Sequence, residues 1–469
     1  MSTSEESIRT GDHQTQTLDV AALARQTLDR LQAFTHMNML ISTSRKTVIA
    51  RAETLDAQLA EGRALPLHGF ALVVKDNINT RDFPTTGGTP LLKWHRPATD
   101  AGVVQRLRTA GALVVGKANL HELAFGITSN NAHFGPVRNP YNSELIAGGS
   151  SGGTAAAVAA GIVPAGLGTD TGGSVRIPAA LCGVCGFRPT SGRYPADGLI
   201  LLSKTRDTIG IIARSVEDIQ ILDHTIAGAE PAHIAQIAGL RIGVPRNPFY
   251  EELHPEVEAV VENTLHTLAE CGVELVELAV PGLLDLNDRI GFPIVLHEAP
   301  IHIQDYLGTL AIPISLEQLI EGIASPDVKR LFQAMCLGHP VDRAVYLHAR
   351  DQLRPDLQKQ FANLFRVHGL EAILYPTTPL TASRIGEDES VEINGVQKPI
   401  FQTYIRNCDP SANAGIPSLT IPAGLATSGL PVGVSLDGPA GSDCRLLALG
   451  AALQARLSPV PKPPAQLQP

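Results

Sequence analysis

The sequence predicts an α/β fold in which a parallel or mixed β-sheet is covered by helices. Two observations carry this prediction: a strand–helix–strand order over residues 69–115, and the same order again over residues 240–278. A third observation is that neither an internal repeat nor a clear linker divides the 469 residues. Large α/β enzymes run to this length as one unit, so we expect a single domain.

The composition is that of an ordinary globular protein, with 44% hydrophobic and 18% charged residues. Aromatic residues make up only 4%, so we expect an aliphatic core rich in alanine. The net charge of −9 argues against a nucleic-acid-binding surface, which would be basic. There is no run of about 20 apolar residues, and residues 1–16 do not resemble a signal peptide. We therefore expect no membrane span and a cytoplasmic location.

The chain begins with a polar tail, residues 1–16, which we expect to be disordered, and the folded domain is expected over residues 17–458. Leucines at 18, 23, 28 and 31 lie among polar residues, which predicts a helical region over 18–58. The elements expected next are a buried strand at 69–74, a helix at 100–110, a strand at 112–115, a helix-like run at 117–125 and a loop at 126–130.

Residues 147–190 hold glycine, serine and threonine at a density that a core helix or strand would not tolerate. Two clusters, 148–153 and 168–174, flank an alanine-rich stretch at 154–161 that predicts a tightly packed helix. Each cluster carries a serine among backbone amides, which suits nucleophilic catalysis. The apolar residues between the clusters disfavour a flexible linker, and the absence of a lysine disfavours a phosphate-binding loop.

A serine nucleophile needs a base, and Lys75 is the natural candidate because it ends the apolar strand at 69–74. The reference pKa of a lysine is about 10.4, so lysine acts as a base at neutral pH only where burial lowers that value. A histidine base remains open, because the partners of a serine can be far away in sequence. A solvated charge at a strand end is the alternative for Lys75 itself.

The C-terminal half repeats the α/β pattern around a longer helical region. Residues 290–368 are expected to be mostly helical, and they carry no chemical motif. The elements expected after them are a strand at 372–375, paired strands at 418–421 and 432–436, a helix at 444–457 and a loose proline-rich tail at 459–469.

Six cysteines are too few for a disulfide framework in a chain of this length. Cys182 and Cys185 form a lone C-x-x-C, and no second ligand pair has the spacing of a zinc site. A redox dithiol remains open, but a pair of small residues that pack a helix is the favoured interpretation. We expect the thiols to be reduced.

The motifs together resemble the amidase signature family. The matching stretches are residues 74–77, 148–153, 168–178 and 182–190. The likeness is strong over about 65–216, which would be the signature core, and looser from residue 374 to the final helix. The resemblance implies one large domain with a twisted mixed β-sheet covered by helices. It also implies hydrolysis of amides through an acyl-enzyme, without metal or organic cofactor.

The resemblance implies a Ser-Ser-Lys triad, with Ser174 as nucleophile, Ser150 as bridging serine after a cis peptide bond from Gly149, and Lys75 as base. It implies an oxyanion hole made by the backbone amides of Thr171, Gly172, Gly173 and Ser174. Supporting roles fall to Ser151, Asp170 and Arg176, and substrate contacts to Thr128, Ser129 and Asn130.

Within that family the chain is similar to mandelamide and indoleacetamide hydrolases, on residues 125–140, 406–417 and 436–443. This likeness implies a small aryl or arylacetamide substrate as partner, and an acyl pocket built from the variable region 290–368. A homodimer is a common assembly in the family. Alternatives are an amidase that cleaves carbamates or anilides, the amidase subunit of a tRNA-dependent amidotransferase, and a catalytically silent binding protein.

Overall fold

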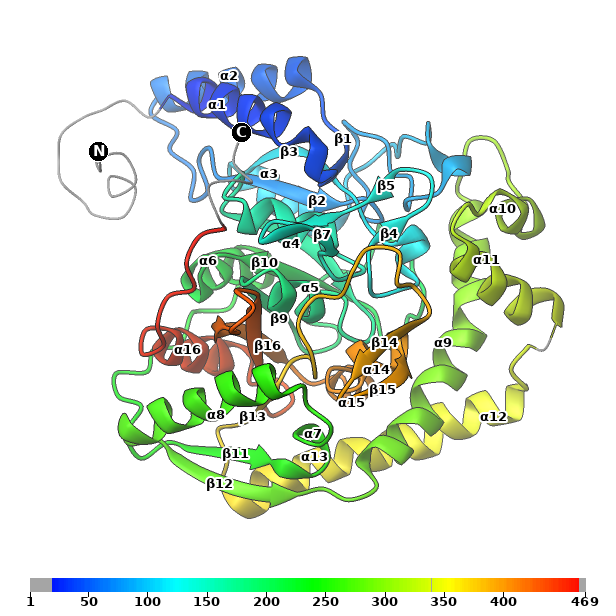
Figure 1. Cartoon of the computed structure of the whole chain (residues 1–469). Coiled ribbons are helices and arrows are strands. Elements are labelled where there is room, and N and C mark those ends of the chain that lie inside the picture. Colours follow the sequence, from blue (N-terminus) through cyan, green and yellow to red (C-terminus); the bar gives the residue numbers. More distant parts are fainter. Residues whose placement is uncertain (1–18, 339, 464–469) are drawn as a thin grey trace.

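The computed structural model describes residues 19–338 and 340–463. Its centre is an 11-stranded mixed β-sheet covered by helices (Figure 1), which confirms the expected fold class. The order across the sheet is β1 (Leu40–Ser42), β3 (Leu113–Ala118), β2 (Ala71–Lys75), β8 (Ala165–Asp170), β10 (Thr208–Ala213), β9 (Cys185–Arg188), β16 (Ser418–Leu425), β17 (Pro431–Asp437), β13 (Ala372–Pro376), β11 (Arg241–Pro245) and β12 (Glu274–Ala279). The expected disordered tail, residues 1–16, lies outside the described residues.

The sheet has a group of parallel strands toward each end and antiparallel strands between them. β2 runs parallel to both β3 and β8, and β11 runs parallel to both β12 and β13. These are the two strand–helix–strand units that the sequence predicts. β16 and β17 pair in antiparallel fashion, as expected. The connecting helices include α3 (Gly102–Thr109), α6 (Val216–Ala227) and α8 (Pro255–Glu270), and α16 (Asp443–Gln454) is the last element of the chain.

Two short helices from the glycine-rich segment pack directly on the sheet, α4 (Gly152–Ala159) and α5 (Arg176–Leu181). Glycine in the strands makes this approach possible: a Cβ atom on Gly433 would lie 2.7 Å from the Cβ of Ala180. A Cβ on Gly186 would meet the Cβ of Ala179 at the same distance. The high glycine content of the segment therefore reflects close packing as well as loop geometry.

The helical region at 290–368 is confirmed, although its first helix begins earlier. The helices are α9 (Leu283–Leu307), α10 (Leu316–Gly322), α11 (Pro326–Gln333), α12 (Arg343–His348) and α13 (Arg354–His368). Figure 1 shows α9 and α12 extending from the sheet, with α10 and α11 at the far end of α9. The apolar faces of α9, α10 and α11 form a separate core with the segment around Leu120–Phe125, and this core includes Val295, Leu319 and Phe332.

Two of the helices predicted from the sequence differ in the structure. The region 18–58 is two helices, α1 (Val20–Ala33) and α2 (Arg45–Ala60), separated by the edge strand β1. Asn38 has a left-handed φ of 55°, and Leu40 pairs with Ala118, so sheet contacts override the leucine spacing there. The run 117–125 is not a helix either, because its first two residues end β3 and only a short 3₁₀ turn follows at Glu122–Ala124.

Cys182 and Cys185 are both buried in the main core, as the packing interpretation expects, although they do not lie on one helix. Cys182 caps the end of α5, but Cys185 begins strand β9. Both are buried free thiols, and burial raises their pKa values above the ordinary range. Among the helices in 19–338 and 340–463, none is both long enough and apolar enough to cross a membrane.

Candidate active site

The sheet brings three separate loops to one place. Lys75 is the last residue of β2, and Ser174 follows β8 in the turn that leads into α5. Because β2 and β8 are parallel neighbours, their carboxyl ends lie at the same edge of the sheet. Ser150 reaches the same edge from the loop before α4. The fold therefore gathers the three residues that the motifs single out.

Lys75 is completely buried and is held by hydroxyl groups. Its Nζ atom lies 2.8 Å from Oγ of Ser150 and 2.8 Å from Oγ1 of Thr169. Burial disfavours the charged amine and lowers its pKa to about 7, although Asp170 and Asp207 act in the opposite direction. A substantial fraction of Lys75 is therefore neutral near pH 7, as a base must be.

Ser150 is also fully buried, and the peptide bond between Gly149 and Ser150 is cis, as the resemblance implies. The Ser150 carbonyl accepts a hydrogen bond from the backbone N–H of His121 at 3.3 Å and from the Ser129 hydroxyl at 3.4 Å. These contacts hold the loop, while the Ser150 hydroxyl faces Lys75. Ser150 is thus held on one side by Lys75 and on the other by His121 and Ser129.

Ser174 is the most accessible of the three, at 8% exposure, and it lines a cavity. Its carbonyl accepts a hydrogen bond from the N–H of Ser151 at 3.1 Å, which ties the two serine loops together. Its hydroxyl makes no hydrogen bond with another of the described residues. Among the described residues, a hydrogen bond joins Lys75 to Ser150, and none joins the Ser150 hydroxyl to that of Ser174.

Residues 171–174, here called the oxyanion loop, present free amides. Within 19–338 and 340–463 the N–H groups of these four residues have no hydrogen-bond acceptor. Gly173 has a φ of 143°, a conformation that side chains disfavour, and a Cβ there would lie 2.7 Å from Cβ of Cys408. Unpaired donors beside Ser174 are what a developing oxyanion requires.

Asp170, the last residue of β8, anchors the oxyanion loop that follows it. Both of its oxygens bond Arg176 at 3.0 Å, and Oδ1 lies 3.1 Å from Nη1 of Arg188. Burial acts to raise the pKa of Asp170, but the two guanidinium groups outweigh it and hold the pKa below its ordinary value. Oδ2 also accepts the N–H of Val175 at 3.2 Å, so the carboxylate fixes the turn directly after Ser174.

Ser151 joins the start of α4 to the sheet, because its hydroxyl contacts the carbonyl of Thr169 at 3.3 Å and the N–H of Thr169 at 3.4 Å. The expected substrate contacts at Thr128, Ser129 and Asn130 do not line the cavity. Thr128 contacts the ring of His121, Ser129 accepts the N–H of Gly152, and Asn130 donates to Asp388.

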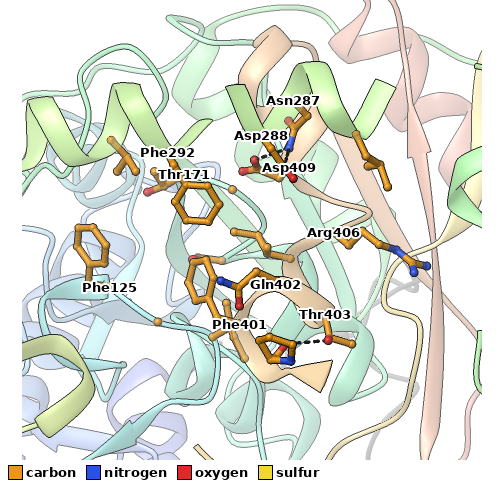
Figure 2. A pocket seen from close by; sticks show the side chains of 18 of the residues that line it. Phe125, Thr171, Asn287, Asp288, Phe292, Phe401, Gln402, Thr403, Arg406 and Asp409 are labelled. Atoms are coloured by element: carbon orange, nitrogen blue, oxygen red, sulfur yellow. Dashed lines mark hydrogen bonds between the residues drawn. The ribbon is translucent and has the colours of Figure 1, made fainter. Parts of the chain in front are cut away.

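The cavity beside Ser174 has a volume of about 300 Å³. Only Phe292 and Val295 come from the region 290–368, so the expectation that this region builds the pocket is largely wrong. Most of the wall comes from residues 124–127, 171–174 and 393–409. Figure 2 shows aromatic rings of Phe125, Phe292 and Phe401 on one side of the cavity and the polar group Asn287, Asp288 and Asp409 on another.

Sequence reasoning missed several residues of this site. Arg188 lay inside a matched motif but received no role, and Thr169 shared a cluster with Ser174. Arg206 and Asp409 form a buried ion pair behind Gly172, and they are separated by 203 positions. No local pattern marks such a pair. In the part of the chain that the structure describes, no cluster of three His, Cys, Asp or Glu side chains could hold a metal ion.

Comparisons with known proteins identify the family. A family model described as Amidase matches residues 22–447. An indoleacetamide hydrolase of Agrobacterium vitis is 48% identical over 434 residues, which cover 92% of each chain. A mandelamide hydrolase of Pseudomonas putida is 40% identical over 93% of this chain and 88% of its own. A crystal structure described as an amidase superposes with a TM-score of 0.85 at 34% identity, over 94% of this chain and 97% of its own.

The buried lysine–serine contact, the free amides beside a second serine and the likeness over nearly the whole length agree with one another. The chain therefore belongs to the amidase family and is an amide hydrolase.

Proposed function

We propose that the protein hydrolyses arylacetamide-type primary amides to a carboxylic acid and ammonia, with Ser174 as nucleophile, Ser150 as proton relay and Lys75 as base. The observation that carries this proposal is the buried contact of 2.8 Å between Lys75 and Ser150, next to a cavity that Ser174 lines. A lysine whose pKa lies at about 7 can accept a proton under neutral conditions.

The reaction follows from these positions. Neutral Lys75 accepts the proton of Ser150, which in turn accepts the proton of Ser174 as that oxygen attacks the amide carbonyl. The oxyanion accepts hydrogen bonds from the oxyanion loop, and each such donor is worth about 3 kcal/mol. The proton then passes to the leaving nitrogen, which departs as ammonia and leaves an acyl-enzyme. Water, deprotonated by the same relay, attacks the ester and releases the acid.

The substrate class rests on the cavity and on the relatives. Phe125, Phe292 and Phe401 offer ring faces and edges to a flat apolar group, while Ser174 and the oxyanion loop line the same space. Two of the similar proteins are named as hydrolases of indoleacetamide and mandelamide, both amides that carry an aromatic ring. A small arylacetamide fits a cavity of about 300 Å³.

The test is a substrate panel with product masses measured. It holds primary arylacetamides, anilides, aryl carbamates and glutamine, and it is run on the wild-type protein and on Ser174→Ala. We expect release of ammonia and an arylacetic acid by the wild type alone. Faster cleavage of carbamates or anilides would contradict the proposed arylacetamide substrate. Glutaminase activity would indicate an amidotransferase subunit.

Labelling with an aryl fluorophosphonate separates an enzyme from a silent binding protein. The wild type should be labelled at Ser174, and Ser174→Ala should not. Equal labelling of both proteins would rule out Ser174 as the nucleophile. A homodimer, a cytoplasmic location and the boundaries 17–458 remain predictions, which light scattering, cell fractionation and limited proteolysis would check.

A further inference from the structure

The turn formed by residues 203–207, here called the bracing turn, contacts the oxyanion loop through Asp207 and lines the cavity through Arg206. Asp207 closes it, because its Oδ2 accepts the N–H groups of Leu202 at 2.7 Å and Ser203 at 3.0 Å. The other oxygen, Oδ1, accepts the hydroxyl of Thr171 at 2.7 Å. Asp207 therefore joins the bracing turn to the first residue of the oxyanion loop.

Glu298 holds the same turn from helix α9. Its Oε2 accepts the Ser203 hydroxyl at 2.6 Å and the N–H of Thr205 at 3.1 Å. Its Oε1 accepts the hydroxyls of Thr205 and, at 2.9 Å, of Tyr346. Burial acts to raise the pKa of Glu298, but these hydrogen bonds outweigh it and lower the pKa. A buried carboxylate that accepts four hydrogen bonds is a rigid connection.

Helix α9 also forms part of the cavity wall, through Asn287, Phe292 and Val295. A second link runs from this helix to the bracing turn, because the Gly291 carbonyl accepts Nη1 of Arg206 at 2.8 Å. The bracing turn therefore contacts both the cavity wall that would hold the acyl group and the loop that would bind the oxyanion.

We propose that Asp207 and Glu298 are positioning residues, which fix the bracing turn so that the oxyanion loop is set before substrate arrives. The inference rests on the proposed function, and neither side chain touches the reacting atoms. Amides stabilise an oxyanion only where they need not reorganise during the reaction. Loss of either carboxylate should therefore reduce turnover more than it reduces substrate binding.

Asp207 has a second effect that Glu298 lacks. Its negative charge acts on the Lys75 amine and opposes the lowering of the pKa by burial, as does the charge of Asp170 on β8. Asp207→Asn removes one of these two charges. The ascending limb of the pH profile should then move to lower pH, whereas Glu298→Gln should leave that limb in place.

The experiment compares Asp207→Asn, Glu298→Gln and the control Asp56→Asn by steady-state kinetics on the full chain. Asp56 is a matched control because its carboxylate also accepts two backbone amides, those of Val20 and Ala21, in the layer of α1 and α2. We expect kcat to fall about tenfold to a hundredfold in both test variants, with KM little changed. The control should keep the wild-type kcat.

A loss of stability alone would lower the melting temperature and leave kcat per folded molecule unchanged, which would overturn the inference. If the carboxylate variants do not fold, Thr171→Val removes only the hydroxyl donor to Asp207 and must itself lower kcat. A wild-type kcat in Thr171→Val would also overturn the inference. An inert wild type would overturn the proposed function together with this inference, whereas an active wild type with unchanged variants would overturn this inference alone.

Discussion

Asp76, which directly follows Lys75 at the end of β2, forms a fully buried ion pair with Lys117 of β3, with Nζ 2.9 Å from Oδ1. Lys117 also donates to the hydroxyl of Thr85 at 2.8 Å. Lys75 lies on the adjacent strand β2 and has hydroxyl partners in place of a carboxylate. Two buried lysines at one sheet edge thus differ in their partners, and this contrast supplies the controls for the first prediction.

Activity should depend on deprotonation of Lys75. In the proposed mechanism the neutral amine is the base, so kcat/KM should rise as pH increases through about 7 and then level off. Lys75→Met should remove most of the activity while the protein stays folded. The check is a pH–rate profile with circular dichroism on each variant.

Lys117→Met is the control for that profile. It leaves Asp76 buried without its partner, which should cost about 3–5 kcal/mol of unfolding free energy. The folded protein should still show the inflection near pH 7. If Lys117→Met removes the inflection and Lys75→Met does not, the base has been assigned to the wrong lysine.

The two serines should differ in covalent labelling. Ser174→Ala removes the nucleophile and should abolish reaction with a fluorophosphonate. Ser150→Ala keeps the nucleophile but breaks the relay to Lys75, so labelling should continue at a rate lower by about 10² or more. Mass spectrometry of the labelled peptide measures both. Full-rate labelling of Ser150→Ala would show that the relay bypasses this residue.

The carboxylate of Asp170 should be important for stability as well as activity. Asp170→Asn leaves Arg176 and Arg188 buried without their anion, which should cost about 3–5 kcal/mol. Urea denaturation followed by fluorescence measures the loss. Glu53→Gln, which breaks an exposed pair with Arg25, should cost less than about 1 kcal/mol. Equal losses would contradict the role of the buried network.

The aromatic cavity wall should determine substrate preference. The rings of Phe292 and Phe401 lie 6.2 Å apart between centroids. Phe292→Ala should raise KM for an arylacetamide by about tenfold, in line with the worth of an aromatic contact, and have a smaller effect on a short aliphatic amide. Phe361→Leu changes an apolar side chain on α13 that does not line the cavity, so it should leave the ratio of the two KM values unchanged.

The amino-acid sequence was sufficient to predict the α/β class, the two strand–helix–strand units and the residues of the proposed triad. Strand ends, glycine clusters and the alanine-rich helix are local features, and local features leave a pattern within about ten residues. Lys75, Ser150 and Ser174 are each found at the end of such a feature. Parallel packing of β2 beside β8 then brings two of them together.

Other features depended on contacts between distant segments. Edge pairing with β3 turned residues 40–42 into a strand inside an apparently helical region. Arg176 reaches Ser411 across 235 positions, and Arg206 reaches Asp409 across 203. The cavity wall combines segments near residues 125, 290 and 400. Only the packed chain decides these partners, because burial selects a polar group by its position in space and leaves no periodicity in the sequence.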